Sequence, residues 1–532
     1  MQESRVTPEL AGRTGCRLAW VLGVLASLAV LLTLGDPGIT IDEPLDVRPG
    51  RVYVTSLLRL GGGAFKPVAV ERIYRDNAEH PPLGRWLLGL ASTAFEPIEA
   101  IVRGGDPTGL FVRSGRVAPA LAFGLLVGRV ALEGGRWGGW ASGLGAGAGL
   151  LLMPRLFGHA HLGALDTFVG LFWTVGLLAV MRATRAPRPL RALGGAGALW
   201  GLALLTKIHG WLLLPAGLIW IGWQLPWRRA VLGAAVWVAS GLSVFFLGWP
   251  WLWYDTGPRL MAFFRTGYER VPILTQYFGT VYRDVDVPWH YPWFYTLATV
   301  PVGLLGLAAV GLVAGLSRPW IRPQAVMLVG VMAGWLTLFS TRVAIYDGER
   351  LFLPVFPLLA LGIGLGFGAI WDRFQGRLAR LALGVLLLSQ AAGVIGLHPY
   401  QLSYYNALVG GLKGAERLGL ELTYWTDVVD EPLLERLVEA AAPGERCALA
   451  PSLAPQQGLA LTTPAMARRE LLLGDQEAVA TSRWILVHRR TAYWTTGIRR
   501  LVESGPALAA QSRQGVWLAG IWEQPAPKSG PQ

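Results

Sequence analysis

The chain has 532 residues, of which 53% are hydrophobic and only 15% are charged, and its mean hydropathy is +0.42. These values exclude an ordinary soluble domain and predict a polytopic membrane protein. The net charge of +13 comes almost entirely from arginine. A basic chain can bind nucleic acid, but these arginines cluster between apolar runs as topogenic charges do, so we expect no nucleic-acid partner.

Apolar runs long enough to cross a bilayer recur from Leu18 to about Leu397. They predict an all-α bundle of about 11 transmembrane helices. The expected spans are residues 18–35, 114–132, 137–154, 163–181, 190–206, 209–224, 230–249, 293–316, 323–341, 351–370 and 380–397.

Arginines follow every second span, as in the pairs Arg228 and Arg229, and Arg318 and Arg322. The positive-inside rule therefore places the N-terminus in the cytoplasm and everything after Leu397 outside. We predict a multi-pass protein of the plasma (inner) membrane, with long outer loops at 36–112 and 250–292.

Two domains are predicted. Residues 1–397 would form the transmembrane domain, and residues 398–532 a small extracytoplasmic α/β domain. A helical pattern covers 430–442, Trp484–Val487 and Val516–Ala519 have strand composition, and the Pro-containing tail is expected to be disordered.

Unusual polar motifs lie at the predicted outer ends of the spans. An acidic pair follows the first span, a Pro-Pro-Leu-Gly-Arg stretch lies in the same loop, and a Pro-Arg-Leu-Phe-Gly-His stretch precedes an aspartate on the fourth span. A lysine and a histidine follow the fifth span, and a Glu-Arg-Leu-Phe-Leu-Pro stretch opens a late one. The polar members are Asp42 and Glu43; His80 and Arg85; Arg155, His159, His161 and Asp166; Lys207 and His209; and Glu349 and Arg350.

In their order and shared side, these motifs resemble GT-C glycosyltransferases of the protein O-mannosyltransferase and aminoarabinose transferase superfamily. The resemblance covers about residues 18–370. It implies a GT-C fold and transfer of a sugar from a polyprenyl-monophosphate-linked donor to a protein, lipid or glycan acceptor outside the cytoplasm. It also implies that Glu43 or Asp166 binds or orients the acceptor and the sugar.

Such a donor already carries a good leaving group, so the reaction needs one base for the acceptor hydroxyl and fixed cations on the departing phosphate. Asp42 is the predicted base, and Lys207, the one lysine in the membrane region, is the predicted phosphate clamp. Further cation candidates are Arg85, Arg116, Arg155, Arg342 and Arg350. An acid after a helix can also be a solvated end, and Lys207 or Arg342 can snorkel to the interface.

Histidines and acids also raise the question of a metal. His80, His159, His161, His209 and Glu349 are candidates for substrate contacts, and ordinary hydrogen bonding explains the i,i+2 pair His159 and His161 better than a metal does. Asp284-Val285-Asp286 matches the Asp-x-Asp metal motif of nucleotide-sugar transferases but lacks its Rossmann-like context. We predict no metal site and no obligatory cofactor, with a divalent metal left as an option.

Two other classes of protein compete with a glycosyltransferase. A transporter or flippase of polyprenyl-linked sugars would place polar groups at the bilayer midplane and show repeated halves, whereas here the span centres carry almost no charge and no repeat is found. A non-catalytic scaffold would leave the one-sided motifs unexplained.

Overall fold

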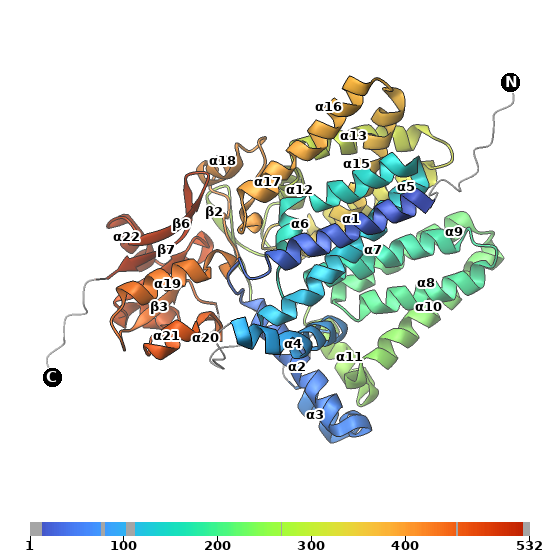
Figure 1. Cartoon of the computed structure of the whole chain (residues 1–532). Coiled ribbons are helices and arrows are strands. Elements are labelled where there is room, and N and C mark those ends of the chain that lie inside the picture. The colour runs from blue at the N-terminus through green and yellow to red at the C-terminus, as the bar shows by residue number, and fades with distance from the viewer. Residues whose placement is uncertain (1–12, 76–79, 103–111, 268, 454–455, 525–532) are drawn as a thin grey trace.

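The computed structural model describes residues 13–75, 80–102, 112–267, 269–453 and 456–524. Figure 1 shows a helical bundle with a small sheet-containing region at one end and the N-terminal helix running toward the other. Within the described ranges, seven helices are long and apolar enough to span a membrane, or eight if one sharply bent pair counts as a span. The long helices are α1 (Arg13–Leu32), α5 (Val117–Leu151), α7 (Asp166–Ala183), α10 (Trp227–Gly248), α14 (Arg322–Phe339), α15 (Val355–Arg373) and α16 (Arg377–Ser389) continued by α17 (Ala391–Gly396).

Helix α5 reverses direction at Gly138 and Gly139, whose backbone is not helical. A Cβ at Gly147 would lie 2.8 Å from the Cβ of Ala131, so residues 16 positions apart face each other across a tight hairpin. Small residues permit this close approach of two helices. The element therefore consists of two antiparallel segments that correspond to the predicted spans 114–132 and 137–154.

The predicted span 293–316 is not one continuous helix. Two helices, α12 (Tyr291–Thr299) and α13 (Val302–Ser317), meet there at 110°. Val300 takes an extended conformation before Pro301, because the proline ring disfavours helical geometry in the preceding residue. Asn406 Nδ2 donates to the carbonyls of Leu297 and Val300, 2.6 Å each, and so stabilises the bend.

Two other predicted spans hold helices that are shorter than expected. The region of the predicted spans 190–206 and 209–224 holds α8 (Pro189–Leu204), η3 (Ile208–Leu212) and α9 (Leu213–Gln224), and α6 (Pro154–His159) precedes α7. The chain breaks after α8 because Lys207 is fully extended, with φ −160° and ψ 159°. This break holds Lys207 between two helices rather than inside one.

The first long loop is itself largely helical. Its two long helices, α2 and α4, pack closely on each other: a Cβ at Gly50 of α2 would lie 2.1 Å from the carbonyl oxygen of Arg85 of α4. The Pro81-Pro82 pair precedes a helix that begins at Leu83. The elements are α2 (Asp42–Leu60), η1 (Gly61–Phe65), α3 (Pro67–Tyr74), α4 (Leu83–Val102) and η2 (Arg113–Arg116).

The second long loop carries a short helix, α11, and a two-stranded antiparallel hairpin that the sequence did not predict. A one-turn helix at residues 350–352 leads into α15. These elements are η4 (Pro250–Trp253), α11 (Thr256–Arg265), β1 (Leu274–Tyr277), β2 (Thr280–Arg283) and η5 (Arg350–Phe352).

The C-terminal region forms a five-stranded mixed sheet in the order β4-β3-β5-β7-β6. Strand β3 is parallel to β4 and β5, and β7 is antiparallel to β5 and β6. The α/β prediction and both predicted strands are confirmed. The strands are β3 (Cys447–Ala450), β4 (Leu473–Gly474), β5 (Trp484–His488), β6 (Ala509–Arg513) and β7 (Val516–Glu523).

Short helices surround this sheet: η6 (Gln401–Ser403), α18 (Gly411–Arg417), η7 (Thr426–Val428), α19 (Glu431–Ala440), α20 (Gln456–Leu461), α21 (Pro464–Arg468), η8 (Gln476–Thr481), η9 (Thr491–Tyr493) and α22 (Thr496–Glu503). The helix predicted at 430–442 is α19. One hydrophobic core runs through the bundle and into the C-terminal region, and a domain boundary at residue 397 stays a prediction. The tail predicted to be disordered lies mostly outside the described residues.

Candidate active site

Four charged side chains from separate segments meet at the end of the bundle nearest the sheet. Asp166 Oδ1 accepts from Lys207 Nζ at 2.8 Å, and its Oδ2 accepts from Arg350 Nε at 3.1 Å. The same guanidinium donates through its second terminal nitrogen to Asp42 Oδ2. We call Asp42, Asp166, Lys207 and Arg350 the charge cluster.

Local backbone structure holds each member at a helix end. Asp42 and Asp166 are the first residues of α2 and α7, where the helix dipole favours a carboxylate. Arg350 follows a turn in which Asp347 and Gly348 have φ of 55° and 65°. Charges at helix ends avoid the apolar centre of a bilayer.

The C-terminal region adds residues that the sequence analysis missed. Arg490 donates to Asp347 Oδ1 at 2.9 Å, and Asp347 Oδ2 accepts from Arg350 at 3.3 Å. The guanidinium of Arg350 also lies 4.5 Å from the ring centroid of Trp425. With Arg490 and Asp347 added to the charge cluster, three carboxylates face three cations, so these six charges balance before any substrate binds. No local sequence signal marks Arg490 or Trp425, because both are brought in by tertiary packing.

Glu43, the neighbour of Asp42, has a different environment. Its carboxylate is fully buried and forms a bidentate pair with Arg116, with Nε to Oε1 at 2.6 Å and a terminal nitrogen to Oε2 at 2.8 Å. The backbone amides of Thr40 and Gly163 donate to the same oxygens. Arg116 in turn donates to three carbonyls, those of Leu34, Pro37 and Gly38. Both ions are saturated, so the geometry does not support the predicted catalytic role of Glu43 or the phosphate role of Arg116.

A second buried pair involves Arg155 and Glu349, 2.7 Å apart. Arg155 also donates to the carbonyl of Tyr404 and lies over the ring of Tyr405. His159 Nε2 lies 3.6 Å from Glu349 and 3.2 Å from the hydroxyl of Tyr424. These contacts tie α6 to the C-terminal region; they do not bring Arg155 or Glu349 into contact with the charge cluster.

Arg85 donates to Asp46, one helical turn after Asp42, at 2.9 Å. Burial raises the pKa of Asp46 to about 6, Arg85 opposes that rise, and the charge of Asp42 adds to it. Asp46 was not predicted, although the i,i+4 spacing of Asp42 and Asp46 places both on one helix face. Arg85 is thus engaged with α2 instead of standing free for a phosphate.

The remaining candidates are spread over several environments. Burial, and then the charges of Arg85, Lys207 and Arg350, hold the pKa of His80 well below its usual value, which places His80 near the charge cluster. The ring of His209 stacks on Trp335 with centroids 5.9 Å apart. His161 contacts Thr33 Oγ1 and the carbonyl of Phe157, 2.8 Å each, away from the cluster. Arg342 is exposed and is not brought to the cluster.

No group of three or more His, Cys, Asp or Glu side chains that could hold a metal ion is found in the described parts of the chain. Asp284, from the Asp-x-Asp sequence, accepts from Arg270 and from the backbone amide of Ile273. That aspartate therefore has a structural role in the loop.

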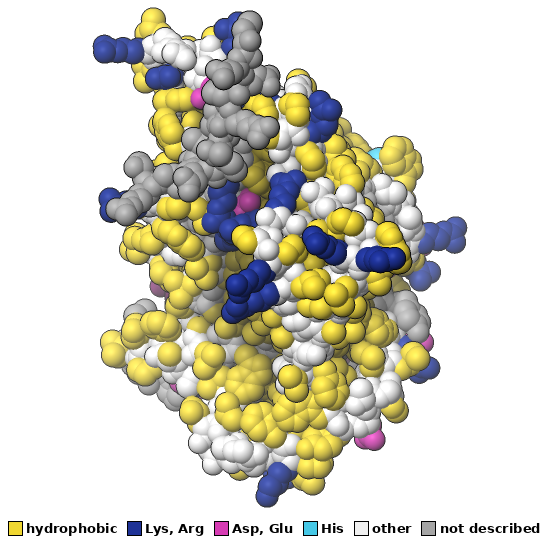
Figure 2. All heavy atoms as spheres, turned by 90° about the vertical axis from the view of Figure 1, so that its right-hand side faces the viewer, with side chains coloured by type: hydrophobic (Ala, Val, Ile, Leu, Met, Phe, Trp, Pro, Cys, Tyr) yellow, Lys and Arg dark blue, Asp and Glu magenta, His cyan; other side chains and the backbone are white. Residues whose placement is uncertain are grey.

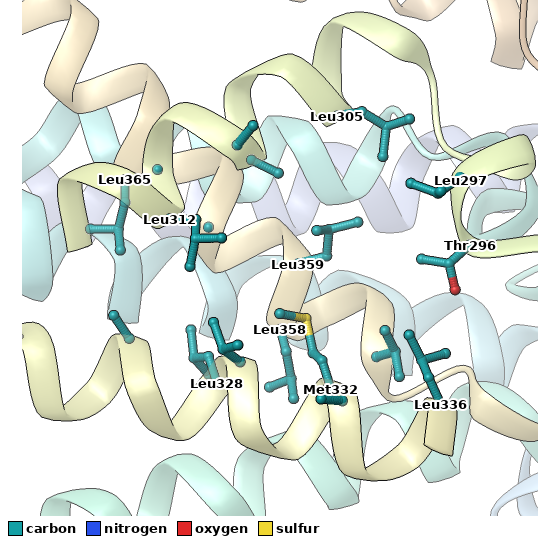
Figure 3. A pocket seen from close by; sticks show the side chains of 18 of the residues that line it. Thr296, Leu297, Leu305, Leu312, Leu328, Met332, Leu336, Leu358, Leu359 and Leu365 are labelled. Carbon is teal, nitrogen blue, oxygen red and sulfur yellow. The ribbon is translucent and has the colours of Figure 1, made fainter. Parts of the chain in front are cut away.

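Several apolar cavities lie among the helices, and two of them border α14. One, of about 490 Å³, runs between α9 and α14 from Leu212 and Trp335 toward Trp223 and Val326. Because His209 stacks on Trp335 and follows Lys207 by two residues, the Trp335 end of this groove is the end nearer the charge cluster. The other, of about 410 Å³, lies between α12, α13, α14 and α15, with leucine side chains on facing helices and Thr296 at one end (Figure 3).

Comparison with known proteins shows which folds and families the chain resembles. Residues 112–254, which include α5 to α10, match the family model for dolichyl-phosphate-mannose-protein mannosyltransferases. The crystal structure of ArnT from Cupriavidus metallidurans in the apo state aligns over 96% of this chain and 99% of its own, with 18% identity and a TM-score of 0.50. The chain therefore has the ArnT-like GT-C fold, and its residues 112–254 resemble the mannosyltransferase family.

Two further structures are similar to this GT-C protein. ArnT from the same organism bound to undecaprenyl phosphate aligns with the same identity and coverage and a TM-score of 0.49. The Pmt1-Pmt2 protein O-mannosyltransferase complex of S. cerevisiae bound to the sugar donor gives 15% identity over 51% of this chain and 39% of its own, with a TM-score of 0.34. No curated protein matches the sequence significantly.

Proposed function

We propose that this protein moves a sugar from a polyprenyl-monophosphate donor to an acceptor hydroxyl at the extracytoplasmic face. The observation that carries the proposal is the convergence of Asp42, Asp166, Lys207 and Arg350 from four distant segments at one end of the bundle. The description of the matched family model, a dolichyl-phosphate-mannose transferase, supports the lipid-phosphate donor.

Asp42 is the proposed general base. Its side chain is 23% exposed, whereas the other carboxylate of the cluster, Asp166, is 4% exposed and binds both cations. An acceptor hydroxyl beside Asp42 would transfer its proton to the carboxylate as its oxygen bonds to C1 of the sugar. The bond from C1 to the phosphate oxygen breaks, and the polyprenyl monophosphate leaves with the electron pair.

Lys207 is the proposed clamp on that phosphate. Its ammonium group has three N–H donors and uses one on Asp166, so two remain to bind an anion. Asp166 would then act as a positioning residue that fixes Lys207 and Arg350 in place. Fixed cations stabilise charge on a leaving group without reorganising during the reaction.

The groove between α9 and α14 is the proposed site of the donor's lipid tail. Its outer residues are exposed, with Ile219 at 64% and Trp223 at 50%, and so would face bilayer lipid. Leu212 and Trp335 line the other end of the groove. The ring of His209, two residues after Lys207, stacks on Trp335 and so links this end to Lys207. A phosphate at Lys207 would therefore leave its isoprenoid chain in an apolar channel.

A flippase of the same lipids is the alternative that the sequence left open. A transporter needs polar groups near the bilayer midplane, whereas Asp42, Asp166, Lys207 and Arg350 all lie at helix ends. The proposed orientation, with the C-terminal region outside, can be tested separately by reporter fusions after Arg191 and after Asn406. They should report opposite sides.

The test compares a deletion strain with strains that carry wild type, Asp42→Asn or Asp255→Asn. Mass spectrometry of membrane lipids and glycans should show a glycosylated product that the deletion strain lacks. Asp42→Asn should reduce its rate of formation by roughly two to four orders of magnitude. Asp255, an exposed acid of the second long loop, is the matched control and should leave the product unchanged. Normal product with Asp42→Asn would rule out Asp42 as the base, and no product difference between wild type and deletion would overturn glycosyl transfer.

A further inference from the structure

A large cavity with arginines in its lining lies at the end of the bundle opposite the charge cluster. Its volume is about 1370 Å³, and it lies mainly between α5, α7 and α8. Figure 2 shows this end of the molecule, with dark-blue basic side chains gathered near its centre around a magenta acidic one. Neither the motifs of the sequence nor the proposed reaction uses this cavity.

Its charged lining is strongly unbalanced. Four arginines, Arg129, Arg136, Arg182 and Arg185, line the cavity together with a single acid, Glu133. Glu133 is 3% exposed, and its Oε2 accepts from Arg129 at 3.4 Å and from Arg136 at 3.0 Å. One carboxylate thus lies between two guanidinium groups, and the cavity keeps a formal charge of +3.

Beneath the arginines the wall is apolar. On α7, Val175, Ala179 and Arg182 follow the spacing of one helix face, and Leu199 of α8 lines the same cavity. The site therefore presents a cationic rim above a hydrophobic wall that continues into the bundle. That combination fits an amphiphile with an anionic head better than a small soluble anion, which would gain nothing from the apolar wall.

We infer that this cavity, named here the arginine cavity, binds a membrane phospholipid whose phosphate head carries a net negative charge. The guanidinium groups of Arg136 and Arg182 would bind the phosphate oxygens, for which planar N–H pairs are well suited. An acyl chain would lie along Val175, Ala179 and Leu199. The inference does not depend on the proposed sugar transfer.

The competing explanation is that these arginines only orient the chain in the membrane. Arg228 can distinguish a topogenic role from lipid binding. It is exposed at the same end of the bundle but does not line the cavity. That it lies at the same end follows from Arg185, which donates to Gln224 at 3.3 Å, just before α10. A topogenic role treats Arg182 and Arg228 alike, whereas a binding site does not.

The experiment is native mass spectrometry of the full-length detergent-purified protein, titrated with dioleoyl phosphatidylglycerol or with zwitterionic dioleoyl phosphatidylcholine. Arg182→Gln should weaken phosphatidylglycerol binding about fivefold, the effect of about 1 kcal/mol per basic residue near anionic lipid. Arg182→Lys should restore most of it, and Arg228→Gln should match wild type. Arg182 is exposed, so the substitution should leave the fold intact.

Three results would overturn the inference. They are equal losses in Arg182→Gln and Arg228→Gln, equal binding of phosphatidylcholine and phosphatidylglycerol by wild type, and full competition by soluble glycerol phosphate. The last would assign the cavity to a free phosphate ester. Turnover of the sugar donor should not change in Arg182→Gln, which separates this site from the charge cluster.

Discussion

Two adjacent carboxylates, those of Asp42 and Glu43, end in opposite environments. The side chain of Asp42 is partly exposed and belongs to the four-membered charge cluster. The carboxylate of Glu43 is fully buried, and its hydrogen bonds come from Arg116 and two backbone amides. Successive helical residues point about 100° apart, so one side chain faces the cluster and the next faces the packed interior. The presence of a carboxylate therefore does not by itself identify a general base. The carboxylate must also be accessible to a substrate.

The largest loss of stability should come from breaking the buried ion pair between Glu43 and Arg116. Glu43→Gln keeps the shape of the side chain but leaves Arg116 buried without its counter-ion, which should cost roughly 3–5 kcal/mol of stability. Thermal unfolding of the purified protein in detergent measures this loss. Asp42→Asn is the matched control and should unfold near the wild-type temperature, since its side chain is 23% exposed. A Glu43→Gln protein that is as stable as wild type but inactive would contradict the comparison.

Within the open cluster, Lys207→Ala should lower the single-turnover rate with a polyprenyl-phosphate sugar by roughly 100- to 1000-fold, because a preorganised cation on the leaving group is lost. Lys207→Arg should recover part of the rate, since the guanidinium is broader and its charge is placed differently. Lys66→Ala removes an exposed lysine of the first long loop and serves as the control. Unchanged rate and donor affinity in Lys207→Ala would mean that Lys207 only snorkels to the interface.

The titration of Asp46 should make the stability of the folded protein depend on pH. Burial raises the folded-state pKa of Asp46 from 3.8 to about 6, so the folded protein binds this proton more tightly than the unfolded chain does. Its contribution is therefore most favourable below about pH 4 and is lost as the pH rises toward 6, by at most about 3 kcal/mol for a shift of about two pKa units.

The unfolding temperature of wild type should fall more steeply between pH 4 and pH 6.5 than that of Asp46→Asn. The slope is compared rather than the absolute value, because the substitution also weakens the pair with Arg85. Parallel curves for the two proteins would show that Asp46 ionises normally.

The smallest effect is expected at His161, which the sequence grouped with the site. His161→Phe removes hydrogen bonds to Thr33 and Phe157 and should cost about 1 kcal/mol for each bond, with turnover unchanged. His159→Phe is the contrasting variant, because His159 reaches Tyr424 and Glu349. A large loss of turnover in His161→Phe with normal stability would return that histidine to the active site.

Much of the molecule follows from the sequence. The helical bundle, the C-terminal α/β region and the membrane character follow from hydropathy and from the spacing of apolar residues. Both can be read from short stretches of sequence. Asp42, Asp166, Lys207 and Arg350 were also named as candidates, because charged residues are rare beside apolar spans and therefore stand out in the sequence. The tight bend of α12 and α13 has a local cause in Pro301 that span length concealed.

Only the tertiary structure decided which candidates meet. Packing of α2 on α4 pairs Arg85 with Asp46, and the C-terminal region brings Arg490 to Asp347 from 143 residues away. Whether Glu43 is open or saturated depends on Arg116, 73 positions along the chain. Local pattern fixes where a charged residue sits along its helix, but its partner is chosen by the packing of segments that are distant in sequence, and that choice separates the open carboxylate from the closed one.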